Sequence, residues 1–356
     1  MGGPSVRCPA LAELPSPPPG KTGWPWTEES LQLPDTRPDG QSRPRVSVVT
    51  PSYNQGQFIE ETIRSVLLQG YPDLEYIIID GGSTDGSIDI IRKYEPWLAY
   101  WVSEPDQGQT HAINKGWMRA TGDILAYINT DDCYLRGAIT TATQEFCSKP
   151  HVGMVYGTAI IVDEAGKELR TWEAWPFDLK TMLTVGSIVP QPAVFYSKNA
   201  LKTVGYLNVE WQMIMDYEFC IRIGMHFPAV CVPGTLAMFR NHGQNKTRLH
   251  FEATARELLH FVTTFSTDQL PPRDWQAIKR ATISRVHYEL ALAYLWAPAE
   301  PQASKAIKEL LECVFLYPTL PLKRPRQTAY IAKELLVGSF KALGGQVADL
   351  VKSMSW

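Results

Sequence analysis

The sequence lacks the features that would assign the chain to a membrane, secreted or metal-cluster protein. Its six cysteines form no CxxC pair and no compact metal-binding spacing, which favours free thiols. No uninterrupted apolar stretch approaches the roughly 20 residues that a membrane helix needs. The opening MGGPSVRCPALAELPSPPPG has no basic cluster leading into an apolar core, so it does not have the pattern of a signal peptide. We therefore expect a cytoplasmic protein, and peripheral association with the inner face of a membrane stays open.

The chain also lacks an excess of positive charge. Its formal net charge of −3 provides no general surface for polyanions. Nucleic acid is therefore not an expected partner, and any phosphate site must be local. With 356 residues, 44% of them apolar and 20% charged, the chain is long enough for one large domain with an appendage, or for two domains.

Composition and hydrophobic spacing divide the chain into three segments. Residues 1–43 are rich in Pro, Gly and Ser and predict an extended arm. Exposed indoles are costly, so we expect Trp24 and Trp26 to pin this arm to the domain. Residues 44–250 predict the main folded domain, and residues 251–356 predict a helical region.

Strand and helix patterns alternate from Arg45 onward. Val46 to Thr50 predicts a strand that breaks at Pro51, and the following GQFIEETIRSVLLQ has helical spacing. A second strand is predicted for Leu74 to Asp80, then another helix, and a short strand for Trp97 to Trp101. This alternation indicates an α/β fold with a parallel, doubly wound sheet, whose ligands bind at the carboxyl ends of the strands.

The stretch LAYINTDDCY, residues 125–134, is the strongest indication of a site. An apolar strand breaks into Asn129, Thr130, Asp131 and Asp132, so two adjacent carboxylates stand where a buried strand meets solvent. Such a pair is costly unless a cation neutralises it, and its oxygens suit Mg²⁺ or Mn²⁺ shared with substrate phosphates. An Asp-rich turn or helix cap is the alternative interpretation.

Two other polar loops follow predicted strands and should reach the same edge. Asp80 ends a buried strand with a carboxylate able to accept a hydrogen bond from a base N–H, and Tyr53 offers a ring for stacking. Together they suit a pyrimidine nucleoside. Ser83 and Asp85, in the loop GGSTDGS, could instead be no more than helix caps.

Further polar residues in this half of the chain allow two interpretations. Asp106, Gly108 and Asn114 could be capping and surface residues, or they could line the phosphate side of the site. Gln191 precedes Pro192 and an apolar strand. Either the residues around Pro192 form the wall of a site, or Pro192 only marks the start of an edge strand.

Six separated motifs carry a family resemblance: VVTPSYNQ, IIIDGGSTDGS, SEPDQGQTHAINKG, ATGDILAYINTDD, IVPQPAVFY and MDYEFCIRI. In this order and spacing, over roughly residues 44–250, the chain resembles the inverting nucleotide-sugar transferases of glycosyltransferase family 2, of the type that builds bacterial cell-surface polysaccharides. The resemblance implies a GT-A fold, here a Rossmann-like sheet with a C-terminal helical appendage. It also implies a UDP-, dTDP- or GDP-sugar donor and a saccharide or lipid-linked saccharide acceptor.

The resemblance also implies roles for single residues. It places Pro51, Tyr53, Asp80 and Asp85 around the base and ribose, and Asp131 beside the ribose or the second coordination shell. Asn54 and Ser83, in the same loops, are further candidate contacts of the nucleotide sugar. Asp132 matches the main ligand of Mg²⁺ or Mn²⁺, although Asn129 stands where many relatives have the first Asp of the motif. His242 is a further candidate metal ligand.

The same resemblance matches Asp216 to the catalytic base, with Met215 in place of the usual Glu. A structural ion pair between Asp216 and Arg222 is the competing interpretation, and Arg222 is otherwise a candidate donor contact. Lys246, with Arg240 and Arg248, forms a local positive cluster suited to a diphosphate leaving group.

The last hundred residues have helical spacing in four runs and no catalytic constellation. We expect them to select the acceptor, to dock a partner or to form a homodimer. Two rival functions remain at this point: a nucleotidyltransferase on a related sheet, and a catalytically silent scaffold whose helical tail binds partners.

Overall fold

The computed structural model describes residues 8–295 and 302–317, which divide into two compact units. The first unit contains the arm and the sheet. It consists of two chain segments, one that runs to Met182 and a second, Ser187–His242. The second unit contains Leu183–Gly186 and the chain from Gly243 onward. Lys246 therefore belongs to the second, helical unit.

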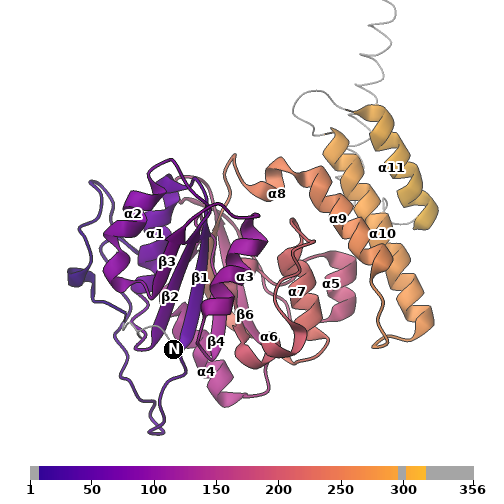
Figure 1. Cartoon of the computed structure of the whole chain (residues 1–356). Helices are drawn as coiled ribbons and strands as arrows, with labels where there is room; N and C mark the ends of the chain where they lie inside the picture. The colour runs from indigo at the N-terminus through magenta and orange to yellow at the C-terminus, as the bar shows by residue number, and fades with distance from the viewer. Residues whose placement is uncertain (1–7, 296–301, 318–356) are drawn as a thin grey trace, which may run out of the picture. The chain divides into compact units, whose positions relative to one another are not determined.

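The first unit is an α/β structure built on one mixed sheet (Figure 1). Its strands are β1 (Val46–Ser52), β2 (Leu74–Asp80), β3 (Tyr100–Ser103), β4 (Ile124–Tyr127), β5 (Cys133–Tyr134), β6 (Met154–Val162), β7 (Glu168–Trp172), β8 (Val194–Ser197) and β9 (Ala229–Arg240). The strand order is β3-β2-β1-β4-β8-β6-β9-β5, with β7 paired to β6. The pairs among β3, β2, β1 and β4 are parallel, whereas β8 is antiparallel to both β4 and β6. The parallel half confirms the predicted parallel, doubly wound sheet, whereas the antiparallel strand β8 makes the other half mixed.

Helices cover both faces of the parallel half, which explains why every residue of β1 and β2 is buried. The helices of this unit are α1 (Gly56–Leu67), α2 (Ser87–Lys93), α3 (Gln109–Arg119), α4 (Ala138–Ser148), α5 (Leu179–Val185, which ends in the second unit), α6 (Lys198–Val204) and α7 (Met215–Gly224), with single 3₁₀ turns at Leu11–Glu13, Glu95–Trp97 and Gln191–Ala193. Val48 packs with the apolar face of α1, and its neighbour Val49 faces α3 on the other side. A Cβ on Gly116 would lie 2.5 Å from Val49 Cγ1, so a glycine lets α3 approach this closely.

Two predicted strand boundaries were wrong. β1 does not break at Pro51 but continues to Ser52, with Pro51 paired to Ile79. Proline has no N–H, but no hydrogen bond to β4 is lost, because the pairing of β1 with β4 already ends at Val49 and Tyr127. The Pro51 carbonyl accepts a hydrogen bond from Thr130 Oγ1. The strand predicted for Trp97 to Trp101 is β3, which starts only at Tyr100 because Glu95–Trp97 forms a 3₁₀ turn.

The arm is pinned to the domain, as its tryptophans predicted. Trp24 Nε1 donates to the Tyr134 carbonyl at 2.8 Å, and Trp26 is buried. The completely buried guanidinium of Arg64, on α1, donates to the carbonyls of Pro15, Pro25 and Trp26. One buried cation therefore satisfies three arm carbonyls that would otherwise lose their hydrogen bonds to water.

The second unit is helical, as predicted from residue 251 onward. It contains α8 (Lys246–Leu249), α9 (Phe251–Thr264), α10 (Pro272–Leu295) and α11 (Ala303–Leu316). Ser284 and His287 of α10 bond to Cys313 and Glu309 of α11, so these two helices form a hairpin. The helix predicted for residues 326–343 lies outside the described residues, and a homodimer through this unit stays a prediction. Among the described helices, none combines the length and hydrophobicity required to cross a bilayer.

Candidate active site

The carboxylate of Asp80 ends β2 and is completely buried under its own loop. Oδ1 accepts hydrogen bonds from the hydroxyls of Ser52 and Ser83, and Oδ2 accepts from the N–H groups of Gly82 and Ser83. The Ser103 hydroxyl donates to Oδ2 at 2.7 Å. Five donors from within the protein therefore meet the roughly four lone-pair sites of one carboxylate. Asp80 ties together the ends of β1, β2 and β3.

The loops after β1 and β2 are also bonded to each other. Asn54, in the left-handed region at φ +50°, donates its N–H to Ser83 Oγ and accepts from the Thr84 N–H through Oδ1. Asp85 Oδ2 accepts from the Gly56 N–H at 2.7 Å, and Oδ1 accepts from both donors of Ser87. Asp85 thus caps α1 and α2 together.

The hydrogen bonds of Asp85 also set its protonation. Partial burial raises the pKa of Asp85, but the donors of Gly56 and Ser87 together outweigh this effect and hold the pKa below its usual value. The carboxylate is therefore ionised throughout the neutral range, as a helix cap requires.

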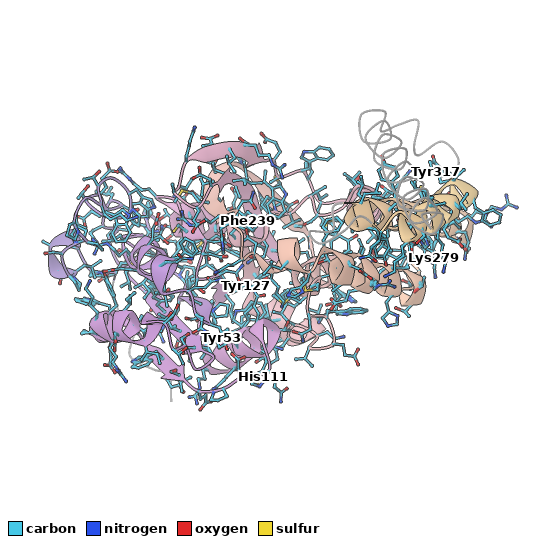
Figure 2. The ribbon with its side chains drawn as sticks, turned by 90° about the horizontal axis from the view of Figure 1, so that it is seen from above. Tyr53, His111, Tyr127, Phe239, Lys279 and Tyr317 are labelled. Atoms are coloured by element: carbon cyan, nitrogen blue, oxygen red, sulfur yellow. The ribbon has the colours of Figure 1, made fainter. Side chains whose placement is uncertain are left out.

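Tyr53 and Asp106 differ from these buried groups because they keep surface facing solvent. Tyr53 follows the end of β1, and its side chain is 64% exposed. Figure 2 labels Tyr53 and also Tyr127, the last residue of β4. Asp106 Oδ1 accepts from the Gly108 N–H at 2.7 Å, which shapes the turn before α3. Gly108 has φ +100°, a conformation that favours glycine.

The turn after β4 carries Asp131 and Asp132. Asp132 is 1% exposed, and its Oδ1 accepts from the Arg240 N–H at 3.0 Å while Oδ2 accepts from Asn129 Nδ2 at 3.3 Å. Burial and the neighbouring charge of Asp131 raise the pKa of Asp132 well above its usual value. Asp131 Oδ2 in turn lies 2.9 Å from His242 Nε2. The pair is thus a buried, electrostatically costly arrangement.

The backbone of this turn is anchored from two sides. On one side, the buried hydroxyl of Thr62 in α1 donates to the carbonyls of Thr130 and Asp132. On the other, Arg240 binds Glu61 at 3.1 Å and donates to the carbonyls of Asp131 and Glu164. The Arg240 guanidinium is therefore engaged inside the protein, contrary to its predicted place in a phosphate-binding cluster.

The donor set of this turn fits a divalent cation in part. Two adjacent carboxylates, of which Asp132 is buried with a raised pKa, provide the oxygen ligands that Mg²⁺ and Mn²⁺ prefer. Within residues 8–295 and 302–317, however, no group of three or more His, Cys, Asp or Glu side chains is arranged to hold a metal. A cation here would need further oxygens from a bound substrate, as phosphates provide.

Amide side chains connect the carboxylate turn to its surroundings. Asn129 Oδ1 accepts from Gln109 Nε2, at the start of α3, and Asn129 Nδ2 also donates to Gln191 Oε1 at 3.0 Å. Gln191 is buried beside Tyr127, whose carbonyl lies 3.4 Å from Gln191 Nε2. The predicted wall residue therefore shares a network with the carboxylates. Asn114, by contrast, uses both ends of its amide on the backbone of Leu207.

Asp216 lies half-buried in the first turn of α7, where the helix dipole favours a carboxylate. Its charge and that of Asp132 both act on the buried Tyr127 hydroxyl, whose pKa is raised well above its usual value first by burial and then by these charges. Asp216 and Asp132 are therefore in the electrostatic neighbourhood of one side chain.

The start of α7 is also attached to the start of α3. The Thr110 hydroxyl bonds to the carbonyl of Trp211 and to Sδ of Met215, the residue in the place of the usual Glu. Arg222 pairs with Glu218 at 2.7 Å and donates to the carbonyls of Val204 and Tyr206, which accounts for its charge without Asp216 or a ligand.

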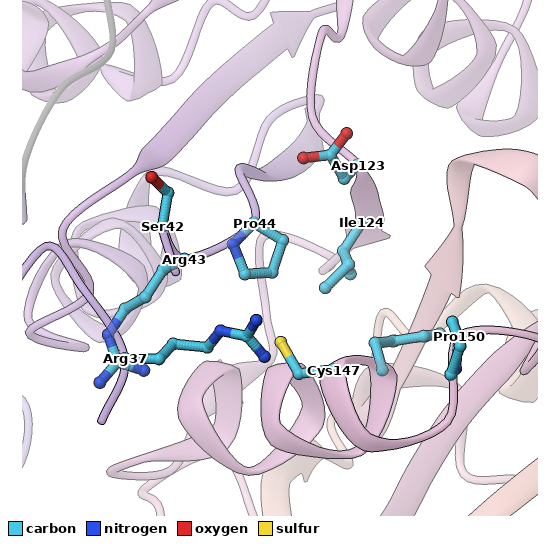
Figure 3. A pocket seen from close by; sticks show the side chains of 9 residues that line it. Arg37, Ser42, Arg43, Pro44, Asp123, Ile124, Cys147 and Pro150 are labelled. Carbon is cyan, nitrogen blue, oxygen red and sulfur yellow. The ribbon is translucent and has the colours of Figure 1, made fainter. Parts of the chain in front are cut away.

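A pocket of about 450 Å³ in the same unit lies away from these residues (Figure 3). Pro44, Asp123 and Ile124 line it, and they stand at the amino ends of β1 and β4. The residues predicted for the site follow the carboxyl ends of the strands. The pocket is therefore at the opposite edge of the sheet and belongs to a different surface.

Several positioning residues were not predicted from the sequence. Thr62 lies inside a helix, 68 and 70 positions from the residues whose carbonyls it binds, and nothing in the local pattern indicates this contact. Ser52 and Ser103 follow or end strands, and their position at strand ends could have marked them. Gln109 directly follows Gly108 in a polar loop that the sequence had already singled out.

The sheet, its two polar loops and the carboxylate turn after β4 have the architecture of a GT-A fold. Two structural neighbours share this fold. TarS of S. aureus, residues 1–349, superposes with a TM-score of 0.56 at 16% identity over 84% of this chain and 92% of that chain. The mannosyltransferase PcManGT from Pyrobaculum calidifontis, in complex with GDP-Man and Mn²⁺, has a TM-score of 0.52 at 23% identity, covering 87% and 90%.

Sequence relatives are more specific. The family model described as glycosyl transferase family 2 matches residues 47–204. An uncharacterized glycosyltransferase of Mycobacterium tuberculosis is 32% identical over 197 residues, which are 55% of this chain and 73% of the relative. A PGL/p-HBAD biosynthesis glycosyltransferase of Mycobacterium bovis is 29% identical over 183 residues, covering 50% and 69%. The chain belongs to glycosyl transferase family 2, which confirms the resemblance predicted from its motifs.

Proposed function

We propose that this glycosyltransferase moves a sugar from a UDP-, dTDP- or GDP-linked donor to a hydroxyl of a saccharide or lipid-linked saccharide, with inversion at the anomeric carbon. The observation that carries the proposal is the arrangement along one sheet edge. An exposed ring at Tyr53, the carboxylate turn at Asp132 and the α7 terminus at Asp216 all adjoin the carboxyl ends of β1, β4 and their neighbours.

In this proposal the side chains of the edge have separate tasks. Tyr53 stacks on the base, and Asp106 and Gly108 form the loop that faces the nucleotide. Asp131 and Asp132 would hold Mg²⁺ or Mn²⁺, which supplies positive charge to the diphosphate when it is bound. His242 holds Asp131 in place at 2.9 Å and is a candidate further ligand.

Asp216 is the proposed general base. Its carboxylate accepts the proton of the acceptor hydroxyl while the acceptor oxygen forms a bond to the anomeric carbon. The bond from that carbon to the β-phosphate oxygen breaks at the same time, and the nucleoside diphosphate leaves with the bonding electron pair. A single displacement of this kind inverts the anomeric centre.

The comparisons support the choice of donor class. TarS has been solved in complex with UDP-GlcNAc, and PcManGT with GDP-Man and Mn²⁺. Because both structural neighbours are below 25% identity, the sugar itself has to be measured.

The test is to incubate the protein with a panel of nucleotide sugars, Mg²⁺ or Mn²⁺, and saccharide acceptors, and to identify the released nucleotide. We expect nucleoside diphosphate with one donor, and loss of turnover with near-normal donor binding in Asp216→Asn. Release of pyrophosphate would instead indicate a nucleotidyltransferase. Absence of any turnover or donor binding would indicate a silent scaffold and would reject the proposal.

A further inference from the structure

The loop after β2 contains a close three-way contact that the proposed function has not used. A Cβ built on Gly81 would lie 2.9 Å from Asp106 Oδ2 and 3.2 Å from Tyr53 Cδ2. The Asp106 carboxylate therefore lies where a side chain of residue 81 would otherwise be, on the same side of Gly81 as the exposed Tyr53 ring. Three loops, after β1, β2 and β3, meet at this point.

The two carboxylates near this point differ in what they can still accept. Asp80 is completely buried and receives five hydrogen bonds from its own protein, so it has no lone pair directed at a ligand. Asp106 is half-buried, and only Oδ1 is engaged, by the Gly108 N–H. Within the described part of the chain, Oδ2 accepts no hydrogen bond.

We infer that Asp106, and not Asp80, reads the nucleotide base, an inference that rests on the proposed function. A base stacked on Tyr53 presents its edge to Asp106 Oδ2, which accepts a hydrogen bond from a ring N–H. Uracil and thymine carry such a donor at N3, and guanine carries one at N1. Cytosine and adenine have an unprotonated ring nitrogen at the matching position, whose lone pair the carboxylate repels.

The inference therefore names a substrate class. Donors with a protonated ring nitrogen on the pairing edge, UDP-, dTDP- or GDP-sugars, should bind, and CDP- and ADP-sugars should be rejected. A hydrogen bond to a charged acceptor supports a discrimination of about ten- to a hundredfold.

The experiment measures binding of UDP, dTDP, GDP, CDP and ADP to the full chain by calorimetry. If UDP is preferred, 3-methyluridine diphosphate is added, because it keeps the ring but lacks the N3 proton; 1-methylguanosine diphosphate serves for GDP. We expect the wild type to lose about ten- to a hundredfold in affinity for the methylated nucleotide. Asp106→Ala should bind both nucleotides equally weakly, so the two changes are non-additive.

Two further variants separate the inference from a general loss of charge or structure. Gly81→Ala keeps every functional group but puts a Cβ 2.9 Å from Asp106 Oδ2, so it should lower affinity for the preferred nucleotide as Asp106→Ala does. Glu104→Gln removes one negative charge two positions away, from an exposed side chain paired with Lys115, and should leave base preference unchanged.

The outcomes distinguish this inference from the proposed function. If the wild type binds nucleoside diphosphates but Asp106→Ala retains full discrimination against the methylated nucleotide, the inference is wrong and the glycosyltransferase proposal stands. Equal binding of all five nucleotides by the wild type would also overturn it. If no nucleoside diphosphate binds at all, both proposals fail.

Discussion

Thr62 offers the most direct test of how the protein scaffold places the carboxylate turn. Its buried side chain sits in α1, and the hydroxyl donates to the carbonyls of Thr130 at 2.8 Å and Asp132 at 2.7 Å. Thr62→Val keeps the shape of the side chain and removes only the donor. Because Thr130 and Asp132 are both buried, water cannot replace the lost bond.

The expected cost follows from that geometry. Leaving a buried carbonyl without its donor costs about 1–3 kcal/mol, and two carbonyls share this one donor. We therefore expect Thr62→Val to lower the free energy of unfolding by about 2–3 kcal/mol, measured by urea titration with tryptophan fluorescence. A displaced carboxylate turn should also lower kcat/KM by about tenfold or more, since a shift of about 1 Å can cost a hundredfold.

Thr62→Ser is the matched control, because it retains the hydroxyl and removes only a methyl group. It should lose about 1 kcal/mol of stability from the missing methyl and keep the donor affinity of the wild type. If Thr62→Val retained wild-type donor affinity and kcat/KM, or if both variants lost them equally, the hydroxyl would not position the turn.

Three other substitutions test separate parts of the structure. Arg64→Met leaves three arm carbonyls without their buried donor and should cost about 3–5 kcal/mol, seen as a lower urea midpoint and faster proteolysis within the arm; an unchanged arm would contradict its role. Asp85→Ala should cost about 1 kcal/mol at pH 7. The pKa of Asp85 is lowered in the folded state, so the carboxylate stabilises the fold at pH values above the usual Asp pKa of 3.8. This stabilisation should be lost as the pH falls below 3.8 and through the lowered pKa. A cost of Asp85→Ala that does not depend on pH would refute this role of the carboxylate. Asn129→Asp replaces a donor 3.3 Å from Asp132 with a like charge, so without metal it should lower the melting temperature, and Mn²⁺ should stabilise it more than the wild type.

The edge of the sheet that carries the site could be predicted because it depends on local patterns. Apolar runs marked β1, β2 and β4, and polar loops followed each run. The carboxyl ends of parallel strands lie together by topology, so the polar loops had to meet. Strand ends near prolines were less predictable, since the tolerance for Pro51 depends on where the neighbouring strand β4 stops.

The roles of single polar residues were not predictable in the same way. Asp80 ends a strand, and the sequence predicts a base contact for it, whereas Asp106 lies in a loop after a strand and is predicted as a cap or as part of the phosphate side. Only the folded chain shows that five internal donors surround Asp80, whereas Asp106 Oδ2 meets none within the described residues. Arg240 similarly resembles a phosphate ligand until its bonds to Glu61 and to backbone carbonyls are known.

In the proposed function, the division between internally bonded and exposed side chains would allow this edge to bind a flexible, charged donor. Asn54, Asp80 and Asp85 make hydrogen bonds within the protein that fix the loops before any ligand arrives. Because these loops are already ordered, binding loses less conformational entropy than it would with mobile loops. Tyr53 keeps its exposed surface on this fixed frame, so the position of the base is set by residues that need not touch it. Substitutions in the frame should therefore weaken binding of every nucleotide, whereas substitutions at Asp106 should change which nucleotide is preferred.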